Sequence, residues 1–518
     1  LAGLGCCDGH GCSDSLLCSL PLLILQMQTM SRLGRISGML LLAFLAVSCS
    51  RKAYTADDFP SDAGPVYPDY MGVTVPAGIA PLNFCYTAPG LSKAVTTFSC
   101  GDESFSVKGV DVRIPRKKWR RLLQAARGSE VLVTSSVIDT SWTIAVSGDD
   151  IDYGLTYRLL EPGYEVYSKM GIYERELGSF REKALIENTE FSGCVNCHAT
   201  NRGEPSQFSL HIRGEHGATL LQLQGSLDAY NTKTDSTLGF CVYPYWHPQG
   251  EYIAYSTNNT RQGFHLQQDK LIEVFDLESD LQIYDIAANC LITAPQIREK
   301  DFWETFPSFS PDGRTLYFSR AVPKEIPEGI TDIRYSLCKV GFDPSDGTIG
   351  DDVEVLIDAE ADSISVCFPR PSYDGRYIVY TQASYGNFSI WHHEADLWMF
   401  DLQTGERWPL DVLNSPDTES YHNFSSNGRW FQFASRRDDG LFTRIYISHF
   451  DPETGEFAKP FMLPQRDPRS FYRDRFLSYN VTEFTTGPVQ LDKVRARRII
   501  ASPERVPFGF RWSGRASD

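Results

Sequence analysis

Short segments that alternate between hydrophobic and polar residues recur along the chain after residue 70. In residues 142–146 and 252–256, apolar side chains fall mainly on every second position, which is the period of a β-strand with one buried face. Turn residues separate these segments. We therefore expect an all-β protein, in which residues 71–190 form a β-rich, sandwich-like N-terminal domain.

Four segments share a longer pattern and form an internal repeat. Each begins with an aromatic-led strand, passes through a turn that ends in glycine, and returns as an alternating strand. The copies begin at Tyr243, Phe306, Phe368 and Tyr421. Turns such as Asp312-Gly313 need a positive φ angle and are typical of β-hairpins. Since another strand follows each hairpin, the unit is a four-stranded blade, and residues 221–490 are predicted to be a β-propeller of five or six blades.

The first fifty residues have the pattern of an export signal. Met30 is the expected start, after upstream residues 1–29, and a basic stretch with Arg32 and Arg35 precedes the apolar residues 39–47. The signal ends in Leu45-Ala46-Val47-Ser48-Cys49, which resembles a bacterial lipoprotein signal. We expect residues 1–48 to be removed, Cys49 to carry the lipid and residues 49–70 to form a tether. The alternative is an ordinary signal peptide that is cleaved near Ser48.

Charge and composition exclude several classes of function. The 518 residues contain 49 Lys and Arg against 66 Asp and Glu, a formal net charge of −17. Such a field repels phosphate backbones, so we expect no nucleic-acid partner. Long apolar runs occur only near the N-terminus, which argues against a polytopic membrane protein. Residues 491–518, which include a basic stretch, are expected to be a C-terminal tail.

One motif indicates specific chemistry. Residues 194–198 read Cys-Val-Asn-Cys-His, the attachment pattern of a c-type haem. Given 13 Cys and 10 His in 518 residues, about 0.006 chance copies are expected per chain. We therefore predict a haem c segment at residues 191–220, with one haem held covalently by Cys194 and Cys197 and with His198 as proximal ligand. The alternatives are a redox dithiol and half of a zinc site completed by His211 and His216.

The second axial ligand of such a haem is expected among the residues that follow the motif. The 20 residues after the motif contain no Met, but they contain His211 and His216. Ligation by His198 and His211 would give a six-coordinate electron carrier, whereas an open site would permit peroxidase-like chemistry. We favour His211, with His216 as the alternative. Arg213 is expected to pair with a haem propionate, because guanidinium groups suit carboxylates.

Two resemblances add to this interpretation. The Ser-Pro-Asp-Gly turn at 310–313 and its variants resemble the blades of TolB-like propellers. Nearly the whole mature chain resembles a family of exported proteins from Bacteroides-type bacteria, often labelled cytochrome c biosynthesis or TolB-like proteins. The matching stretches are residues 73–84, 160–167, 193–198, 211–214 and 421–440. The resemblance implies a haem, a propeller and the presence of His211, and the sequence departs from it at Ala218, where Gly is expected.

Three functions follow from these observations. The first is an exported monohaem c-type cytochrome-like lipoprotein that carries electrons, with a propeller that docks a redox protein or a membrane-associated complex. The second is a TolB-like interaction scaffold whose haem is structural or sensory, and the third is a haem peroxidase. A hydrolase is disfavoured because no Gly-x-Ser-x-Gly motif occurs. We favour the non-enzymatic carrier, anchored by its lipid on the periplasmic side of the cell envelope, with the outer membrane as the expected membrane.

Overall fold

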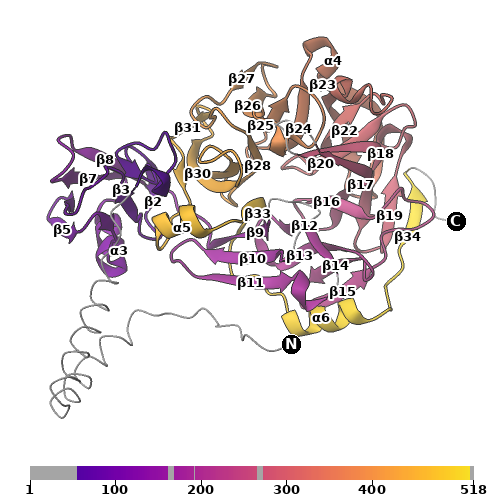
Figure 1. The fold of residues 1–518 in the computed structure, drawn as a ribbon. Coiled ribbons are helices and arrows are strands. Elements are labelled where there is room, and N and C mark those ends of the chain that lie inside the picture. Colours follow the sequence, from indigo (N-terminus) through magenta and orange to yellow (C-terminus); the bar gives the residue numbers. More distant parts are fainter. Residues whose placement is uncertain (1–54, 162–168, 192, 265–271, 514–518) are drawn as a thin grey trace, which may run out of the picture. The chain divides into compact units, whose positions relative to one another are not determined.

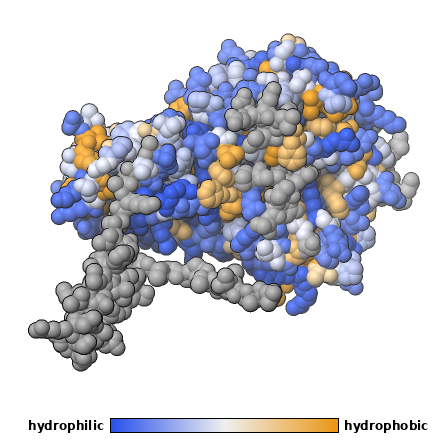
Figure 2. All heavy atoms as spheres, in the orientation of Figure 1, coloured by the Kyte–Doolittle hydropathy of each residue, from blue (hydrophilic) through white to orange (hydrophobic). Residues whose placement is uncertain are grey.

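The computed structural model describes residues 55–161, 169–191, 193–264 and 272–513 (Figure 1). The predicted export signal and Cys49 lie outside these residues. From Ala56 onward the described residues belong to one compact unit. Hydrophilic residues dominate the face of the surface in Figure 2. Within the described ranges, none of the helices has the length and hydrophobicity needed to cross a bilayer.

The N-terminal part contains two sheets and one α-helix, so it is β-rich, although it ends before Gly154 and not at residue 190 as predicted. One sheet has the order β1 (Val66–Tyr67), β3 (Phe84–Tyr86), β6 (Asp111–Val112). The other has the order β2 (Thr74–Pro76), β8 (Trp142–Ser147), β7 (Ser129–Ser135), β4 (Val95–Cys100), β5 (Glu103–Lys108). The Phe84 ring lies 6.2 Å from that of Trp142 between the sheets. Helix α3 (Arg116–Ala125) buries Trp119 against Phe98, with the ring centroids 6.0 Å apart.

Six further sheets are the blades of a β-propeller, which confirms the predicted all-β fold class. Blade 1 contains β33 (Ser478–Thr485), β9 (Gly154–Leu160), β10 (Gly171–Glu176) and β11 (Glu182–Glu187). Blade 2 contains β12 (Cys194–Asn201), β13 (Glu204–Arg213), β14 (Ala218–Leu223) and β15 (Ser226–Tyr230). Blade 3 contains β16 (Cys241–Trp246), β17 (Tyr252–Phe264), β18 (Ile272–Asp285), β19 (Cys290–Thr293) and β34 (Gly509–Trp512).

Blades 4 to 6 follow in chain order and contain the repeat copies that begin at Phe306, Phe368 and Tyr421. Blade 4 contains β20 (Trp303–Phe309), β21 (Thr315–Ala321), β22 (Tyr335–Asp343) and β23 (Thr348–Ile357). Blade 5 contains β24 (Ser365–Pro371), β25 (Tyr377–Ala383), β26 (Asp396–Asp401) and β27 (Arg407–Pro409). Blade 6 contains β28 (Glu419–Phe424), β29 (Trp430–Ser435), β30 (Arg444–Asp451), β31 (Glu456–Phe457) and β32 (Phe461–Met462). The ring is closed because β33 pairs antiparallel with β9.

The domain boundaries in the structure differ from those predicted from the sequence. Strands β9–β11 belong to blade 1 rather than to the domain expected at 71–190, and β12–β15 form blade 2 rather than a separate segment at 191–220. Strand β9 does alternate, with Leu155, Tyr157 and Leu159 separated by polar residues. Its inner partner β33 comes from the far end of the chain, so blade 1 lacks the local hairpin repeat by which blades 3 to 6 are recognised. Residues 491–513 are not a loose tail: Asp492 caps helix α6 (Lys493–Ala501), and β34 pairs in parallel with β19.

A two-residue bulge interrupts the innermost strand of every blade. The inner pairings shift register at Asn196-Cys197, Tyr243-Pro244, Phe306-Pro307, Phe368-Pro369, Tyr421-His422 and Val481-Thr482. In five of these bulges the first residue has a φ angle of 46–53°, a left-handed conformation that costs a side-chain-bearing residue about 1–2 kcal/mol. Asn196 is the exception.

These bulges direct aromatic side chains to the centre of the ring. The Phe306 and Phe368 rings lie 4.1 Å apart, and their neighbours Tyr243 and Tyr421 lie 4.7 Å from Phe306 and 5.0 Å from Phe368. Because the four residues come from four blades, they meet where the blades converge. They form an aromatic plug that fills the middle of the propeller axis.

One end of the axis is covered by a long hairpin. Cys241 at the start of β16 pairs with Thr257, so the later residues of β17 extend beyond the point where the inner strands begin. There Ile272 and Val274 pack against Phe388, Ile390 and Trp391 of blade 5 and against Tyr421 and Leu441 of blade 6. Since blade 6 lies opposite blade 3 in a ring of six, the hairpin spans the axis at this end.

The plug predicts a large stability effect at its centre. We expect Phe368→Ala to lower the free energy of unfolding by about 3–5 kcal/mol, because it removes a buried ring and leaves a cavity among three others. Urea denaturation of the purified chain measures this. The matched control is Phe264→Ala, since the Phe264 side chain is 63% exposed and its loss should cost less than about 0.5 kcal/mol. Equal effects at the two positions would contradict a central plug.

Candidate functional site

The Cys194–His198 motif lies in β12, the innermost strand of blade 2. Val195 pairs with Ile212 and His198 with Leu210, so Asn196 and Cys197 are the bulged residues. The turn glycine Gly203 follows Asn196 by seven positions, the same spacing as from Tyr243 to Gly250 and from Phe306 to Gly313. The motif is thus also another copy of the blade repeat.

His198 faces blade 1 and is buried. Its side chain is 1% exposed, its Nε2 lies 3.0 Å from Thr156 Oγ1 of β9, and its ring lies 5.8 Å from that of Phe208. Burial, helped by the nearby Arg158 cation, lowers the pKa of His198 to about 3. The imidazole is therefore neutral at physiological pH, and its Nδ1 has no hydrogen-bond partner among the described residues.

His211 lies on the other face of the same sheet. Because side chains alternate along a strand and Leu210 pairs with His198, the next residue in β13 points away from His198. Nδ1 of His211 lies 3.4 Å from Thr219 Oγ1, and its ring lies 5.1 Å from that of Phe240. Burial lowers its pKa to about 3 as well. The structure therefore does not bring His198 and His211 to one point.

Arg213 and the two motif cysteines lie at the same end of the hairpin. Cys194 pairs with Arg213 in the register of β12 and β13. Burial raises the pKa of the Cys197 thiol, although Arg213 and Arg158 lower it. Both cysteines are free thiols, and Cys197 is only 2% exposed. Of the predicted residues, Cys194, Cys197 and Arg213 therefore lie together.

The donor types suit a c-type haem, but their placement does not. Two free thiols and a neutral imidazole are the groups that haem attachment and ligation use. However, the His198 ring packs between Thr156 and Phe208, and the His211 ring faces the next blade. A macrocycle ligated by both would have to displace β12 from its neighbours. Among the described residues no three His, Cys, Asp or Glu side chains are grouped to hold a metal ion, and Cys49 lies outside them.

Arg158 is the least satisfied charge next to the motif. It lies on β9, is 5% exposed, and its Nη2 donates to Met170 Sδ at 3.4 Å and to Cys194 Sγ at 3.3 Å. Its Nε has no partner, and no carboxylate in the described part of the chain pairs with it. A buried guanidinium normally has a carboxylate partner, so sulfur acceptors alone leave this cation poorly compensated.

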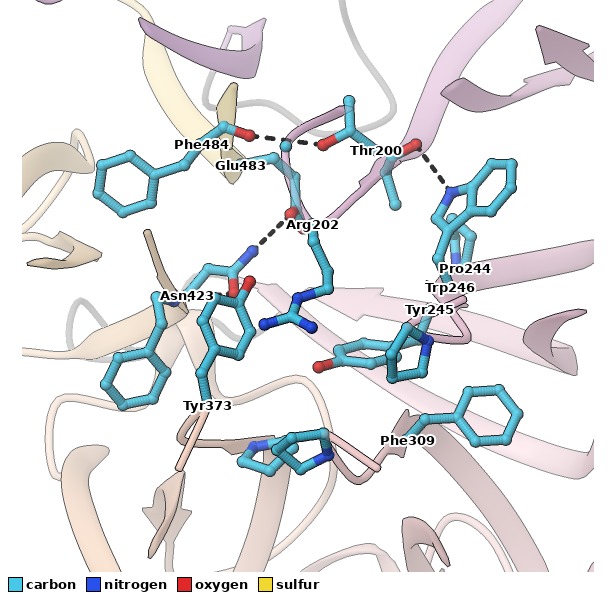
Figure 3. Close-up of a pocket in the computed structure, with 16 residues that line it drawn as sticks. Thr200, Arg202, Pro244, Tyr245, Trp246, Phe309, Tyr373, Asn423, Glu483 and Phe484 are labelled. Atoms are coloured by element: carbon cyan, nitrogen blue, oxygen red, sulfur yellow. Dashed lines mark hydrogen bonds between the residues drawn. The ribbon is translucent and has the colours of Figure 1, made fainter. Parts of the chain in front are cut away.

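A cavity opens at the uncovered end of the axis, where the inner strands end. Its volume is about 40 Å³, and all six blades line it. Aromatic rings and prolines make up most of the wall, and Arg202, Asn423 and Glu483 are among its polar members (Figure 3). We call this cavity the axial mouth. It combines a largely apolar wall with a few convergent polar groups, as small-ligand sites do.

Three polar residues of the mouth stand at equivalent places in different blades. Tyr245, Asn423 and Glu483 each follow the two-residue bulge of their strand, and His198 has the same position in blade 2. Burial raises the pKa of Glu483 to about 7, although Arg370 and a hydrogen bond from Asn423 lower it. This carboxyl therefore titrates near neutral pH.

No short sequence motif marks these mouth residues. Arg202, Tyr245, Tyr373 and Glu483 are widely separated in the chain. The spacing itself was an available signal, because the position after each bulge lies five residues before the turn glycine in blades 2 to 6. Aligning the repeats on that glycine would have placed Tyr245, Asn423 and His198 in one ring.

Comparisons with known proteins bear only on the fold. The chain matches no family model and no curated protein sequence. Similar solved structures include TolB from Acinetobacter baumannii (TM-score 0.41, 13% identity, covering 71% of this chain and 85% of that one). Others are an oligogalacturonate lyase from Vibrio parahaemolyticus (0.34, 13%, 56% and 70%) and a hypothetical selenium-binding protein from Sulfolobus tokodaii (0.37, 10%, 66% and 96%). At these values we draw nothing about ligand or activity from them.

The buried His198 predicts a pH dependence of stability. Its folded pKa is lowered to about 3, so between that value and about 6.5 the unfolded chain binds more protons and stability falls with falling pH. Between pH 7 and 5 this single group should cost about 2 kcal/mol. We expect His198→Gln to reduce the difference in unfolding free energy between these two pH values by that amount, as measured by chemical denaturation.

Thr156→Val is the matched control for that experiment. It removes the partner of His198 Nε2 without removing the titrating ring, so stability should fall similarly at both pH values. A wild-type pH dependence in His198→Gln would show that His198 does not titrate as a buried group.

Proposed function

We propose that this chain is an exported β-propeller protein of the cell envelope that binds a partner at its axial mouth. The observation that carries the proposal is the difference between the two ends of the axis. One end is spanned by the β17–β18 hairpin, while the other has a cavity lined by residues from all six blades. The aromatic plug between them fills the axis, so the mouth suits binding rather than passage through the ring.

The location belongs to the same proposal and is supported by the sequence. The export signal and Cys49 favour a lipid-anchored protein on the periplasmic side, with the outer membrane as the expected membrane. The tether predicted at residues 49–70 is shorter than expected, because Phe59 and Tyr70 are buried and β1 pairs with β3. The residues between Cys49 and Ala56 would then link the folded part to the bilayer. No bond chemistry by the protein is part of this function.

A second candidate is the monohaem c-type electron carrier expected from the sequence. Two observations favour it: the spacing of Cys194, Cys197 and His198, and the poorly compensated Arg158 beside them. An added carboxylate, such as a haem carries, would satisfy Arg158. The packing around His198 and the separate placement of His211 argue against it. Both candidates use the propeller for docking, and a peroxidase has no further observation in its favour.

Photocrosslinking in the native host tests the mouth. A photoreactive residue at Pro248, which lines the mouth, should give one discrete adduct. The same residue at Val355, which is 46% exposed on the outermost strand of blade 4, should not. Tyr245→Ala should abolish the Pro248 adduct because it alters the wall of the cavity. Adducts of similar yield from both positions, or an adduct that survives Tyr245→Ala, would contradict docking at the mouth.

Haem staining separates the two candidates. The full chain is produced together with a c-type maturation system, and a denaturing gel is stained for haem. From the packing of β12 we expect no covalent haem, and thiol titration after denaturation should find Cys194 and Cys197 free. Stain that is lost in the Cys194→Ala, Cys197→Ala double variant would establish the carrier instead. A visible spectrum of the oxidised and reduced protein would then report whether His211 completes the ligation.

A further inference from the structure

Arg202 lines the axial mouth, and a second cation, Arg370, lies next to its wall against the Tyr245 ring. Arg202, in the turn between β12 and β13, lies 4.3 Å over the Tyr373 ring, and its guanidinium sits between the rings of Tyr373 and Tyr245 (Figure 3). Arg370 of β24 lies 5.1 Å over the Tyr245 ring. Within the described ranges neither guanidinium forms an ion pair, and Nε of Arg370 is buried without a partner.

Among the described residues, Glu483 is the one carboxyl that lines this cavity. Glu483 of β33 accepts a hydrogen bond from Asn423 Nδ2, and Arg370 acts on it only through its charge, without an ion pair. Burial raises its pKa to about 7. Other ionisable groups act on the two tyrosines from the surrounding elements: Arg202, Arg370, Asp152 and Glu483. Asp152 is held by the backbone and hydroxyl of Ser426, away from Glu483.

We propose that the axial mouth binds a carboxylate group, which Arg202 holds by charge-assisted hydrogen bonds and which Arg370, next to the wall, attracts through its charge. This rests on the proposed role of the mouth as a binding site and names its ligand chemistry. Guanidinium groups match carboxylates in shape and charge. The cavity of about 40 Å³ admits a group of a few heavy atoms. The ligand therefore enters by one carboxylate, whether this is a peptide C-terminus or a small free acid.

A cationic ligand is the opposite possibility, because aromatic walls with an acid can bind ammonium groups. In this mouth, however, the protein's own arginines already occupy the faces of Tyr245 and Tyr373. A further cation would have to displace them. The net charge of −17 is spread over the whole chain, and charges beyond about 10 Å are largely screened at physiological ionic strength.

Glu483 makes carboxylate binding dependent on pH. When it is ionised it repels an incoming carboxylate, and when it is protonated that repulsion disappears. Its protonated fraction falls about tenfold between pH 6 and pH 8 for a pKa near 7. Affinity for a carboxylate should therefore fall about tenfold over the same interval.

Fluorine NMR with trifluoroacetate as the probe tests the proposal on the full chain. Trifluoroacetamide, which has the same shape without the charge, is the control ligand. We expect binding of trifluoroacetate alone, about tenfold tighter at pH 6 than at pH 8. Arg202→Gln should weaken it about tenfold or more, whereas Arg116→Gln on the exposed side of α3 should leave it unchanged. Glu483→Gln should bind tightly at both pH values.

The possible outcomes distinguish a wrong ligand class from a wrong binding site. Equal binding of the two probes, or full binding by Arg202→Gln, overturns the carboxylate assignment. If tetramethylammonium binds instead and Tyr245→Ala abolishes this, the mouth remains a binding site of the opposite class. If no probe binds and the Pro248 photocrosslink is also absent, both proposals fail. Tighter binding of triglycine than of acetate, lost in triglycine amide, identifies a peptide C-terminus; similar binding identifies a small free acid.

Discussion

The two-residue bulge in each innermost strand is the constraint on which the rest of the propeller depends. It turns one residue of every blade toward the axis, and in five blades that residue takes a left-handed φ angle. Such strain persists only where surrounding contacts compensate it. Here the rings of Tyr243, Phe306, Phe368 and Tyr421 compensate it by packing together. The plug, the polar ring beyond it and the separation of the two axial ends all follow from this repeated irregularity.

The same constraint explains why the Cys194–His198 motif has two interpretations. A blade needs a strand, a bulge and a return through a turn glycine, and residues 195–203 supply all three. Haem attachment needs two thiols and an imidazole on one side of the strand. Ligation by a second histidine needs His198 and His211 to point to one place, yet the bulge and the alternation of β12 and β13 direct them to opposite faces of the sheet. Blade 2 is also the one blade whose first bulge residue, Asn196, avoids the left-handed conformation. Its inner strand thus departs from the others where the motif lies.

The sequence predicted the fold class and four of the six blades because hairpin turns and alternating strands leave local signals. It missed blade 1, since the innermost strand β33 comes from the far end of the chain and no hairpin repeat therefore precedes β9. Contacts between distant residues leave no local pattern. The prediction for 194–198 identified residues that lie together but not their faces, because the register shift at Asn196-Cys197 is a property of pairing rather than of composition. The mouth residues were missed for the same reason.

The charges of the axis are arranged according to what covers them. At the hairpin end, Asp276 is buried but accepts hydrogen bonds from Asn258, Tyr335 and Asn387, so its polar atoms are satisfied from three blades. At the mouth, Arg202 rests on the Tyr373 ring and Arg370 lies next to the wall on the Tyr245 ring, and aromatic faces stabilise a cation without neutralising it. A cation left without an anion retains its capacity to bind one. At the covered end Arg436 also rests on a ring, that of Trp391, but it is only 3% exposed, whereas Arg202 lines an open cavity. Access as well as charge therefore supports the proposal that a partner docks at the mouth.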